Sequence, residues 1–170
     1  KILIKNKKKF LKILKDYDVK SFGLSVYDKK YANLFIKNFN KGSIQFPYNI
    51  LNTDFKDLKK KNLIFYARSV FLQGLLTEKK IFIQNKQLLK KHEEYLRYIK
   101  TNKIDPLKLC LNFALNDSNN NFVVFGVKNL IQLKIILNNI KINQALSKQN
   151  IHLNKIRKFF IKKKLDPRNW

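Results

Sequence analysis

"IFYARSVFLQGLL", residues 64–76, begins as an apolar run, stops at Arg68 and Ser69, and becomes apolar again at Val70. A short apolar run rich in aromatic residues is typical of a parallel strand that is covered on both faces. The polar pair marks the carboxyl end of that strand, and Gly74 permits the turn that follows. The stretch therefore predicts a buried strand whose carboxyl end faces a site.

Further segments of the chain repeat this pattern and alternate with helical ones. Buried parallel strands are predicted at 21–26, 43–49, 63–68 and 121–126. Amphipathic helices are predicted at 7–16, 28–38, 86–99 and 129–140, with a lysine-coated helix at 144–163. Asp105 followed by Pro106 marks one more helix start, a capping residue before proline at the first helical position. The alternation predicts an α/β fold with a parallel sheet.

Polar residues collect where these strands end, which favours a barrel over a doubly wound sheet. The chain has only 4 glycines, too widely spaced for the G-x-G-x-x-G loop that binds dinucleotides in a doubly wound sheet. In a (β/α)8 barrel the carboxyl ends of the strands form the active-site face, and a whole barrel takes about 250 residues. The four predicted strands in these 170 residues therefore correspond to half of such a barrel.

The charge of the chain leaves a nucleic-acid function open without favouring it. The formal net charge is +26, which would attract phosphates. Arginine is favoured for base-edge and bidentate phosphate recognition, but most of the basic residues are lysines spread along the chain, as on solvated helix faces. The composition favours a globular protein with no specific nucleic-acid partner.

Three further observations concern the cellular compartment and whether the sequence is part of a longer protein. Cys110 is the only cysteine, so no internal disulfide can form and a cytoplasmic location is expected. No apolar run approaches the about 20 residues of a membrane helix, so no membrane partner is expected. The sequence contains no methionine, even at position 1, which gives the expectation that it is part of a longer protein.

Five segments, in this order along the chain, resemble the C-terminal half of the bacterial aldo/keto reductases, in the branch found near surface-polysaccharide and nonulosonic-acid genes. They are "FGLSVYD" (22–28), "IQFPYNILNTDF" (44–55), "YARSVFLQGLL" (66–76), "VFGVKNLIQL" (124–133) and "LDPRNW" (165–170). The resemblance implies strands 5 to 8 of a (β/α)8 TIM barrel, with their helices and a C-terminal helix. Residues 1–170 would then be a single partial domain whose N-terminal half is absent.

The resemblance also implies a reductase that uses NADPH to reduce a carbonyl substrate, a sugar or a compound related to polysaccharide precursors. Ser25 and Gln45 match residues that contact the nicotinamide carboxamide. Arg68 stands where many members carry an aromatic residue that stacks on the nicotinamide. The other matches are to residues that contact the rest of the cofactor. Ser69 and Phe71 match the segment around the pyrophosphate. The loop that holds the adenosine phosphates is matched by Gly126, Val127 and Lys128, and Gln132 matches a residue near the adenine.

The residues agree with part of this assignment. A glycine at a strand end lets the backbone approach a phosphate, and Lys128 supplies charge. A helix beginning near Asn129 is expected to present free amides to the phosphates.

The catalytic aspartate, tyrosine, lysine and histidine of this family belong to its first four strands, so the resemblance implies no catalytic residue, no metal ligand and no independent activity in this chain. His92 and His152 lie in lysine-rich helical segments and are predicted to be surface or half-buried. A basic nucleic-acid-binding protein and a catalytically dead half-barrel scaffold remain alternatives. A half barrel leaves two strand edges open, so the isolated chain is expected to pair with itself or with a partner half, or to aggregate. The missing N-terminal half is the partner that the resemblance implies.

Overall fold

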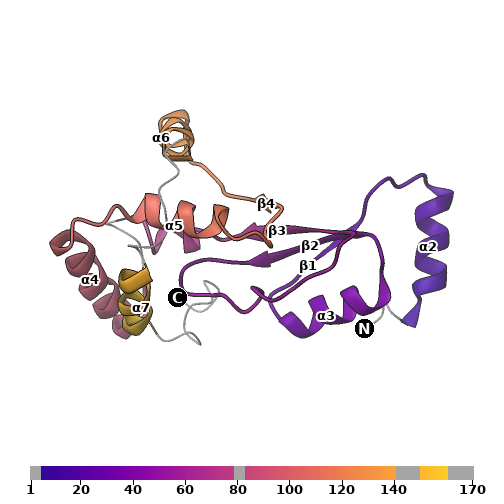
Figure 1. The fold of residues 1–170 in the computed structure, drawn as a ribbon, viewed down its shortest axis with the longest axis horizontal. Helices are drawn as coiled ribbons and strands as arrows, with labels where there is room; N and C mark the ends of the chain where they lie inside the picture. The colour runs from indigo at the N-terminus through magenta and orange to yellow at the C-terminus, as the bar shows by residue number, and fades with distance from the viewer. Residues whose placement is uncertain (1–4, 79–82, 141–149, 161–170) are drawn as a thin grey trace.

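Four parallel strands form one sheet in the computed structural model, which describes residues 5–78, 83–140 and 150–160 (Figure 1). The strands are β1 (Gly23–Ser25), β2 (Gly42–Pro47), β3 (Leu63–Arg68) and β4 (Phe122–Val123), and their order in the sheet follows their order in the chain. Each neighbouring pair is parallel. The predicted α/β class and parallel sheet are confirmed; β3 coincides with its predicted run, whereas β1, β2 and β4 are shorter than theirs.

Helices precede β1 and follow β1, β3 and β4 in the chain. They are α2 (Lys7–Asp16), α3 (Lys29–Asn38), the 3-10 turn η1 (Leu72–Gly74), α4 (Lys86–Thr101), α5 (Pro106–Leu115), α6 (Leu130–Ile140) and α7 (Asn150–Phe159). α5 begins as its sequence predicts, since the Asp105 carboxylate accepts hydrogen bonds from the amides of Leu107 and Lys108 at 3.0 and 3.1 Å. The remainder of the predicted helix at 144–163 and the "LDPRNW" segment lie outside the described residues. No helix in the described ranges has the length and apolar character needed to cross a bilayer.

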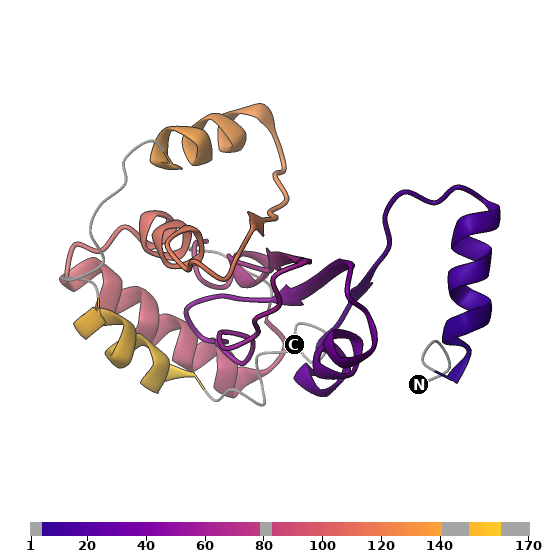
Figure 2. The same cartoon turned by 45° about the vertical axis from the view of Figure 1, so that its right-hand side comes forward.

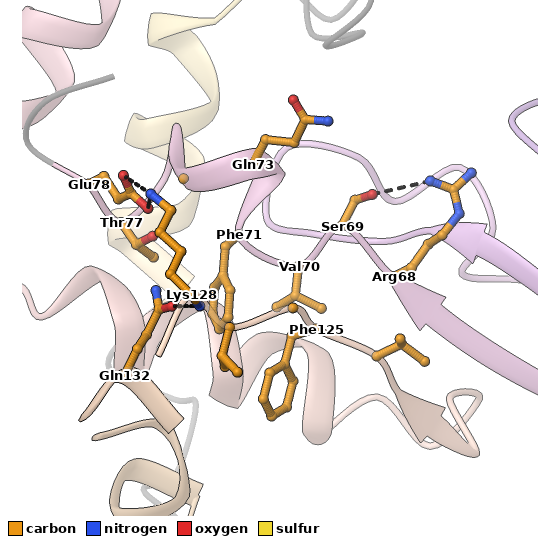
Figure 3. Close-up of a pocket in the computed structure, with 14 residues that line it drawn as sticks. Arg68, Ser69, Val70, Phe71, Gln73, Thr77, Glu78, Phe125, Lys128 and Gln132 are labelled. Atoms are coloured by element: carbon orange, nitrogen blue, oxygen red, sulfur yellow. Dashed lines mark hydrogen bonds and ion pairs between the residues drawn. The ribbon is translucent and has the colours of Figure 1, made fainter. Parts of the chain in front are cut away.

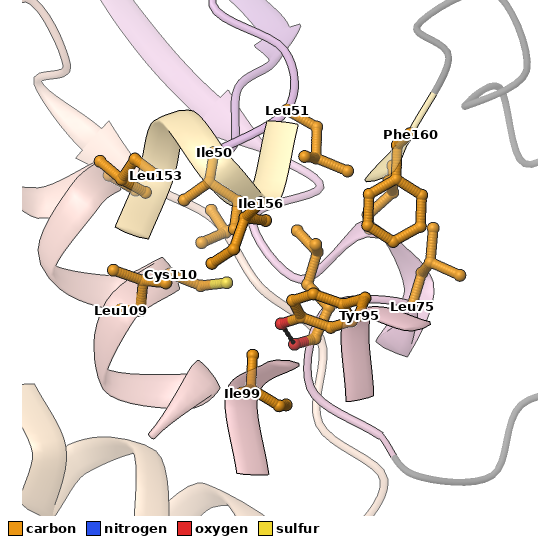
Figure 4. Close-up of a cluster of buried hydrophobic side chains, with 14 of the residues drawn as sticks. Ile50, Leu51, Leu75, Tyr95, Ile99, Leu109, Cys110, Leu153, Ile156 and Phe160 are labelled. Atoms are coloured by element: carbon orange, nitrogen blue, oxygen red, sulfur yellow. Dashed lines mark hydrogen bonds between the residues drawn. The ribbon is translucent and has the colours of Figure 1, made fainter. Parts of the chain in front are cut away.

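The buried side chains form two clusters, and the second positions the segment that follows β3. One cluster joins β2 and β3 to α3 through side chains such as Phe46, Phe65 and Phe35. The other lies between α4, α5 and α7, and α4 and α7 run side by side in both views (Figures 1 and 2). At its centre the Tyr95 hydroxyl donates a hydrogen bond of 2.6 Å to the Leu76 carbonyl (Figure 4). The chain after η1 is therefore anchored to α4.

One face of the sheet stays open in the described structure, so the prediction of strands covered on both faces is wrong here. Phe65 and Ala67 are buried on one face of β3, whereas Ile64 on the other face is 41% exposed. Phe122 and Val124 are also exposed, at 53% and 39%. Side chains alternate between the two faces of a strand, and the described core packs against only one of them.

Candidate functional site

A cavity of about 660 Å³ lies at the carboxyl ends of β3 and β4. Its walls come from the segment after β3, which includes η1, and from the loop between β4 and α6 (Figure 3). The residues that line it are Arg68, Ser69, Val70, Phe71, Gln73, Gly74, Thr77, Glu78, Val124, Phe125, Gly126, Val127, Lys128 and Gln132. All the predicted site residues except Ser25 and Gln45 are among them. Segments about 50 residues apart in sequence thus meet at one edge of the sheet.

Ser25 and Gln45 form a second group at the same edge. Ser25 ends β1 and is in register with Gln45, which lies two residues before the end of β2, and the Ser25 hydroxyl donates a hydrogen bond of 3.1 Å to Gln45 Oε1. Arg68 connects this group to the cavity, because its Nη2 donates to the Val26 carbonyl at 3.4 Å. The predicted carboxamide pair is therefore adjacent to the cavity without lining it.

The Arg68 guanidinium is held from several sides. Its Nη1 donates to the Ser69 hydroxyl at 3.2 Å, and its central carbon lies 4.2 Å from the centroid of the Tyr27 ring. Its Nε is buried and has no hydrogen-bond partner among the described residues. An aromatic ring does accompany this position, but it comes from the end of β1, and sequence reasoning did not assign Tyr27 to the site. The contact fixes a cation beside the cavity.

The segment after β3 has an unusual backbone. Ser69, Leu72 and Gln73 have φ values of 57°, 47° and 51°, in a region that residues other than glycine rarely adopt. Gly74 continues the turn at φ 91°. Strained turns of this kind cluster at ligand sites, where surrounding packing maintains them. Phe71 supplies part of that packing, with its ring centroid 6.1 Å from that of Phe125 across the cavity wall.

The loop after β4 brings Lys128 and Gln132 together. The Lys128 amide donates to Gln132 Oε1 at 2.7 Å, and the Gln132 amide donates to Asn129 Oδ1 at 2.9 Å. The prediction that the start of α6 presents free amides is wrong for these two, since nearby side chains already accept their hydrogen bonds. Gly126 is open, with nothing within 4 Å of where a Cβ would stand.

Glu78 is a cavity residue that the sequence did not indicate. Its carboxylate oxygens lie 2.8 and 3.0 Å from Lys128 Nζ. Its one distinguishing feature in the sequence is its charge, because the chain has only 11 acidic residues against 37 basic ones. The residues described by the structure include no group of three or more histidine, cysteine, aspartate or glutamate side chains placed to hold a metal ion.

The sequence model of the aldo/keto reductase family matches residues 7–158. The chain belongs to the aldo/keto reductase family. The match covers both walls of the cavity and every predicted site residue. No curated protein matches the chain.

Solved structures of aldo/keto reductases share this fold. The holo form of aldo-keto reductase AKR11C1 from Bacillus halodurans is 18% identical with a TM-score of 0.69, over 88% of this chain and 55% of that one. The glycerol dehydrogenase AKR11B4 from Gluconobacter oxydans is 16% identical with a TM-score of 0.61, over 92% of this chain and 54% of that one. The chain thus spans just over half the length of these relatives and has the fold of a partial TIM barrel.

His92 lies behind the cavity wall, and its predicted surface or half-buried position is wrong. It is 2% exposed on α4, and its Nε2 has no hydrogen-bond partner within the described structure. The lysines around it in sequence lie on the other side of the helix, so local composition did not reveal its burial. Burial lowers the pKa of the imidazole, and the backbone of Leu75 and Glu78 opposes this shift. His152 is half-buried as predicted, with its Nδ1 2.9 Å from the Tyr98 hydroxyl.

The buried imidazole predicts a loss of stability in mild acid. The folded state resists protonation of His92, whereas the unfolded chain binds the proton below about pH 6.5. The free energy of unfolding should therefore be retained above that pH, and should fall as the pH is lowered from about 7 to 5. Chemical denaturation at several pH values measures this slope, which His92→Leu should reduce. An equal slope in the variant would show that His92 does not cause it.

Proposed function

We propose that this chain is the cofactor-binding C-terminal portion of an NADPH-dependent carbonyl reductase. Family membership supports an oxidoreductase with a nicotinamide cofactor. The observation that carries the proposal is the cavity at the strand ends, where Arg68 and Lys128 present two cations to one space of about 660 Å³. Ligand pockets of proteins typically have volumes of about 300 to 1,000 Å³, so the space suits a large part of a dinucleotide.

Each group of cavity residues has a separate role in this proposal. Lys128, with the open backbone at Gly126, would hold the adenosine phosphates, and the turn at Ser69 and Phe71 would surround the pyrophosphate. Arg68 would lie near the nicotinamide end. The Nε, which has no partner in the part of the chain that the structure describes, and the fixed guanidinium support a role in binding, because a buried donor without a partner is costly unless a ligand supplies one.

The carboxamide end would be held by Ser25 and Gln45. Their mutual hydrogen bond places a hydroxyl and an amide side by side at the strand ends, and a carboxamide can use both as partners. When bound, the reduced nicotinamide supplies the hydride. The residues of this chain orient the cofactor, and the acid that protonates the product oxygen would come from the rest of the barrel.

We extend the proposal to the substrate and the cellular location. The substrate would be a carbonyl compound related to sugars or polysaccharide precursors. The protein would act in the cytoplasm, where the buried thiol of Cys110 remains reduced.

The test of the proposed function is cofactor binding to the full-length protein. Titration with NADPH, followed by the fluorescence of the reduced nicotinamide, should give saturable binding at micromolar concentrations. Carbonyl compounds should then cause oxidation of the bound cofactor. A full-length protein that is folded and binds no nicotinamide dinucleotide would contradict the proposal.

The partner in this proposal is the N-terminal half of the barrel, which would cover the open sheet face. Ile64, Phe122 and Val124 are exposed there. The rings of Tyr66 and Phe122 stack at 5.1 Å and extend the apolar surface. α6 adds Leu130 and Ile131, which are 63% and 71% exposed, and the helix projects from the body of the molecule (Figure 2). Apolar surface of this extent marks an interface.

Introducing a charge on this face should prevent association of the two halves. When the halves are expressed as separate chains, Ile64→Asp should reduce co-purification at least tenfold, because the carboxylate would be buried without a partner. Tyr17→Asp is the matched control, since Tyr17 is 79% exposed just after the distant α2 and its substitution should have no effect. Equal recovery of the two variants would contradict the proposed interface.

A further inference from the structure

Glu78 is the only carboxylate among the described residues that line the cavity. It faces Lys128 across the mouth, and both of its oxygens contact Nζ, at 2.8 and 3.0 Å (Figure 3). The pair joins the segment after η1 to the loop after β4. The cation assigned to the adenosine phosphates is therefore already paired with an anion.

The Glu78 side chain is fixed in this position by its neighbours. Its amide donates to the Gly74 carbonyl at 2.7 Å. A Cβ added at Gly74 would lie 2.9 Å from Glu78 Cδ and 3.0 Å from Oε1, so the absence of a side chain at Gly74 makes room for the carboxylate. The Glu78 side chain is 31% exposed, whereas that of Lys128 is 73% exposed. The carboxylate is thus the more rigid member of the pair and belongs to the cavity wall.

The Glu78–Lys128 pair should affect the binding of NADPH and of NADH in different ways. A 2′-phosphate approaching Lys128 meets the carboxylate as a like charge at close range, which disfavours it. A ribose 2′-hydroxyl can instead donate a hydrogen bond to the carboxylate, the way in which acidic residues select NAD in other dinucleotide sites. The same pair of residues therefore acts in opposite directions on the two cofactors.

We propose that Glu78 is a specificity-determining residue that limits the preference of this site for NADPH and admits NADH. The inference rests on the proposed function, because it assigns the adenosine end of the cofactor to Lys128. It predicts a protein that binds both dinucleotides, with a smaller difference between them than Lys128 alone would give.

The experiment compares Glu78→Gln with the wild type in the full-length protein. Dissociation constants are measured for NADPH and NADH, and for the fragments 2′,5′-ADP and 5′-AMP as probes of the adenosine end. Glu78→Gln keeps the shape of the side chain against Gly74 and removes its charge. NADPH and 2′,5′-ADP should bind about tenfold more tightly to the variant, the size expected for removing one partly screened charge beside a phosphate. NADH and 5′-AMP should bind several-fold more weakly.

Glu93→Gln is the matched control, because Glu93 is an exposed carboxylate on α4 outside the cavity lining. It should change none of the four constants. If Glu78→Gln changes both dinucleotides by the same factor, or changes neither, the specificity role is overturned and the proposed function stands. A wild-type protein that binds neither dinucleotide would overturn both.

Discussion

Replacing Arg68 with alanine in the full-length protein is expected to weaken NADPH binding by about 10- to 100-fold, the range of one or two charge-assisted hydrogen bonds. The guanidinium lies at the cavity edge and is oriented by Val26, Ser69 and Tyr27. Its removal takes away the cation nearest the proposed nicotinamide end. Because Arg68 is half-buried and lies at a strand end, the free energy of unfolding should change by only about 1 kcal/mol.

Arg97→Ala serves as the control for this result. Arg97 is an exposed arginine on α4, so its removal subtracts the same charge from the molecule without touching the cavity. Fluorescence titration should give wild-type affinity for this variant. If the Arg97 and Arg68 variants lose affinity equally, the effect would belong to overall charge. Unchanged affinity in Arg68→Ala would remove Arg68 from the site.

The largest effect on stability is expected from Tyr95→Ala. The side chain is 0% exposed, packs against Phe160 at a centroid distance of 5.6 Å, and donates a hydrogen bond to the Leu76 carbonyl. Truncation leaves a cavity in the cluster and an unsatisfied carbonyl, with a loss of about 3 to 5 kcal/mol in the free energy of unfolding. Denaturant titration of the full-length protein measures this loss.

One further variant separates packing from hydrogen bonding at this position, and a second is an exposed control elsewhere in the chain. Tyr95→Phe removes only the hydroxyl, and should lower the free energy of unfolding by about 1 kcal/mol. Tyr17→Ala, at a site that is 79% exposed, should change it by no more than about 0.5 kcal/mol. A loss in Tyr95→Ala no larger than that in Tyr95→Phe would contradict the packing described around α4.

Local sequence patterns predicted most of the elements of this fold. The Asp105–Pro106 signal placed the start of α5, and the apolar run at 63–68 coincides with β3. The sequence did not predict which face of each strand is buried. Ile64 and Phe65 are both apolar, yet they point to opposite faces, and only the arrangement of the helices decides which one is covered.

Some residues of the candidate site could likewise be predicted from the sequence, and others could not. The positions of Arg68 and Lys128 at the cavity could be predicted from motifs, because Arg68 ends β3 and Lys128 lies in the loop after β4, each within a recognisable segment. Glu78 could not, since its role depends on an ion pair with a residue 50 positions away. The burial of His92 likewise depends on packing between distant segments, and the lysines beside it in sequence suggested the opposite.

Hydrogen exchange of the full-length protein, with and without NADPH, tests whether the cofactor binds in the cavity at the strand ends. Binding in the cavity should slow the exchange of backbone amides in residues 69–78 and 126–132, whose segments form the two walls. Residues 29–38, which form α3 outside the cavity, should exchange at the same rate in both samples. Slower exchange in both walls is expected on NADPH addition, because the bound cofactor would cover both segments. Saturating NADPH that leaves both walls unchanged would contradict binding in the cavity.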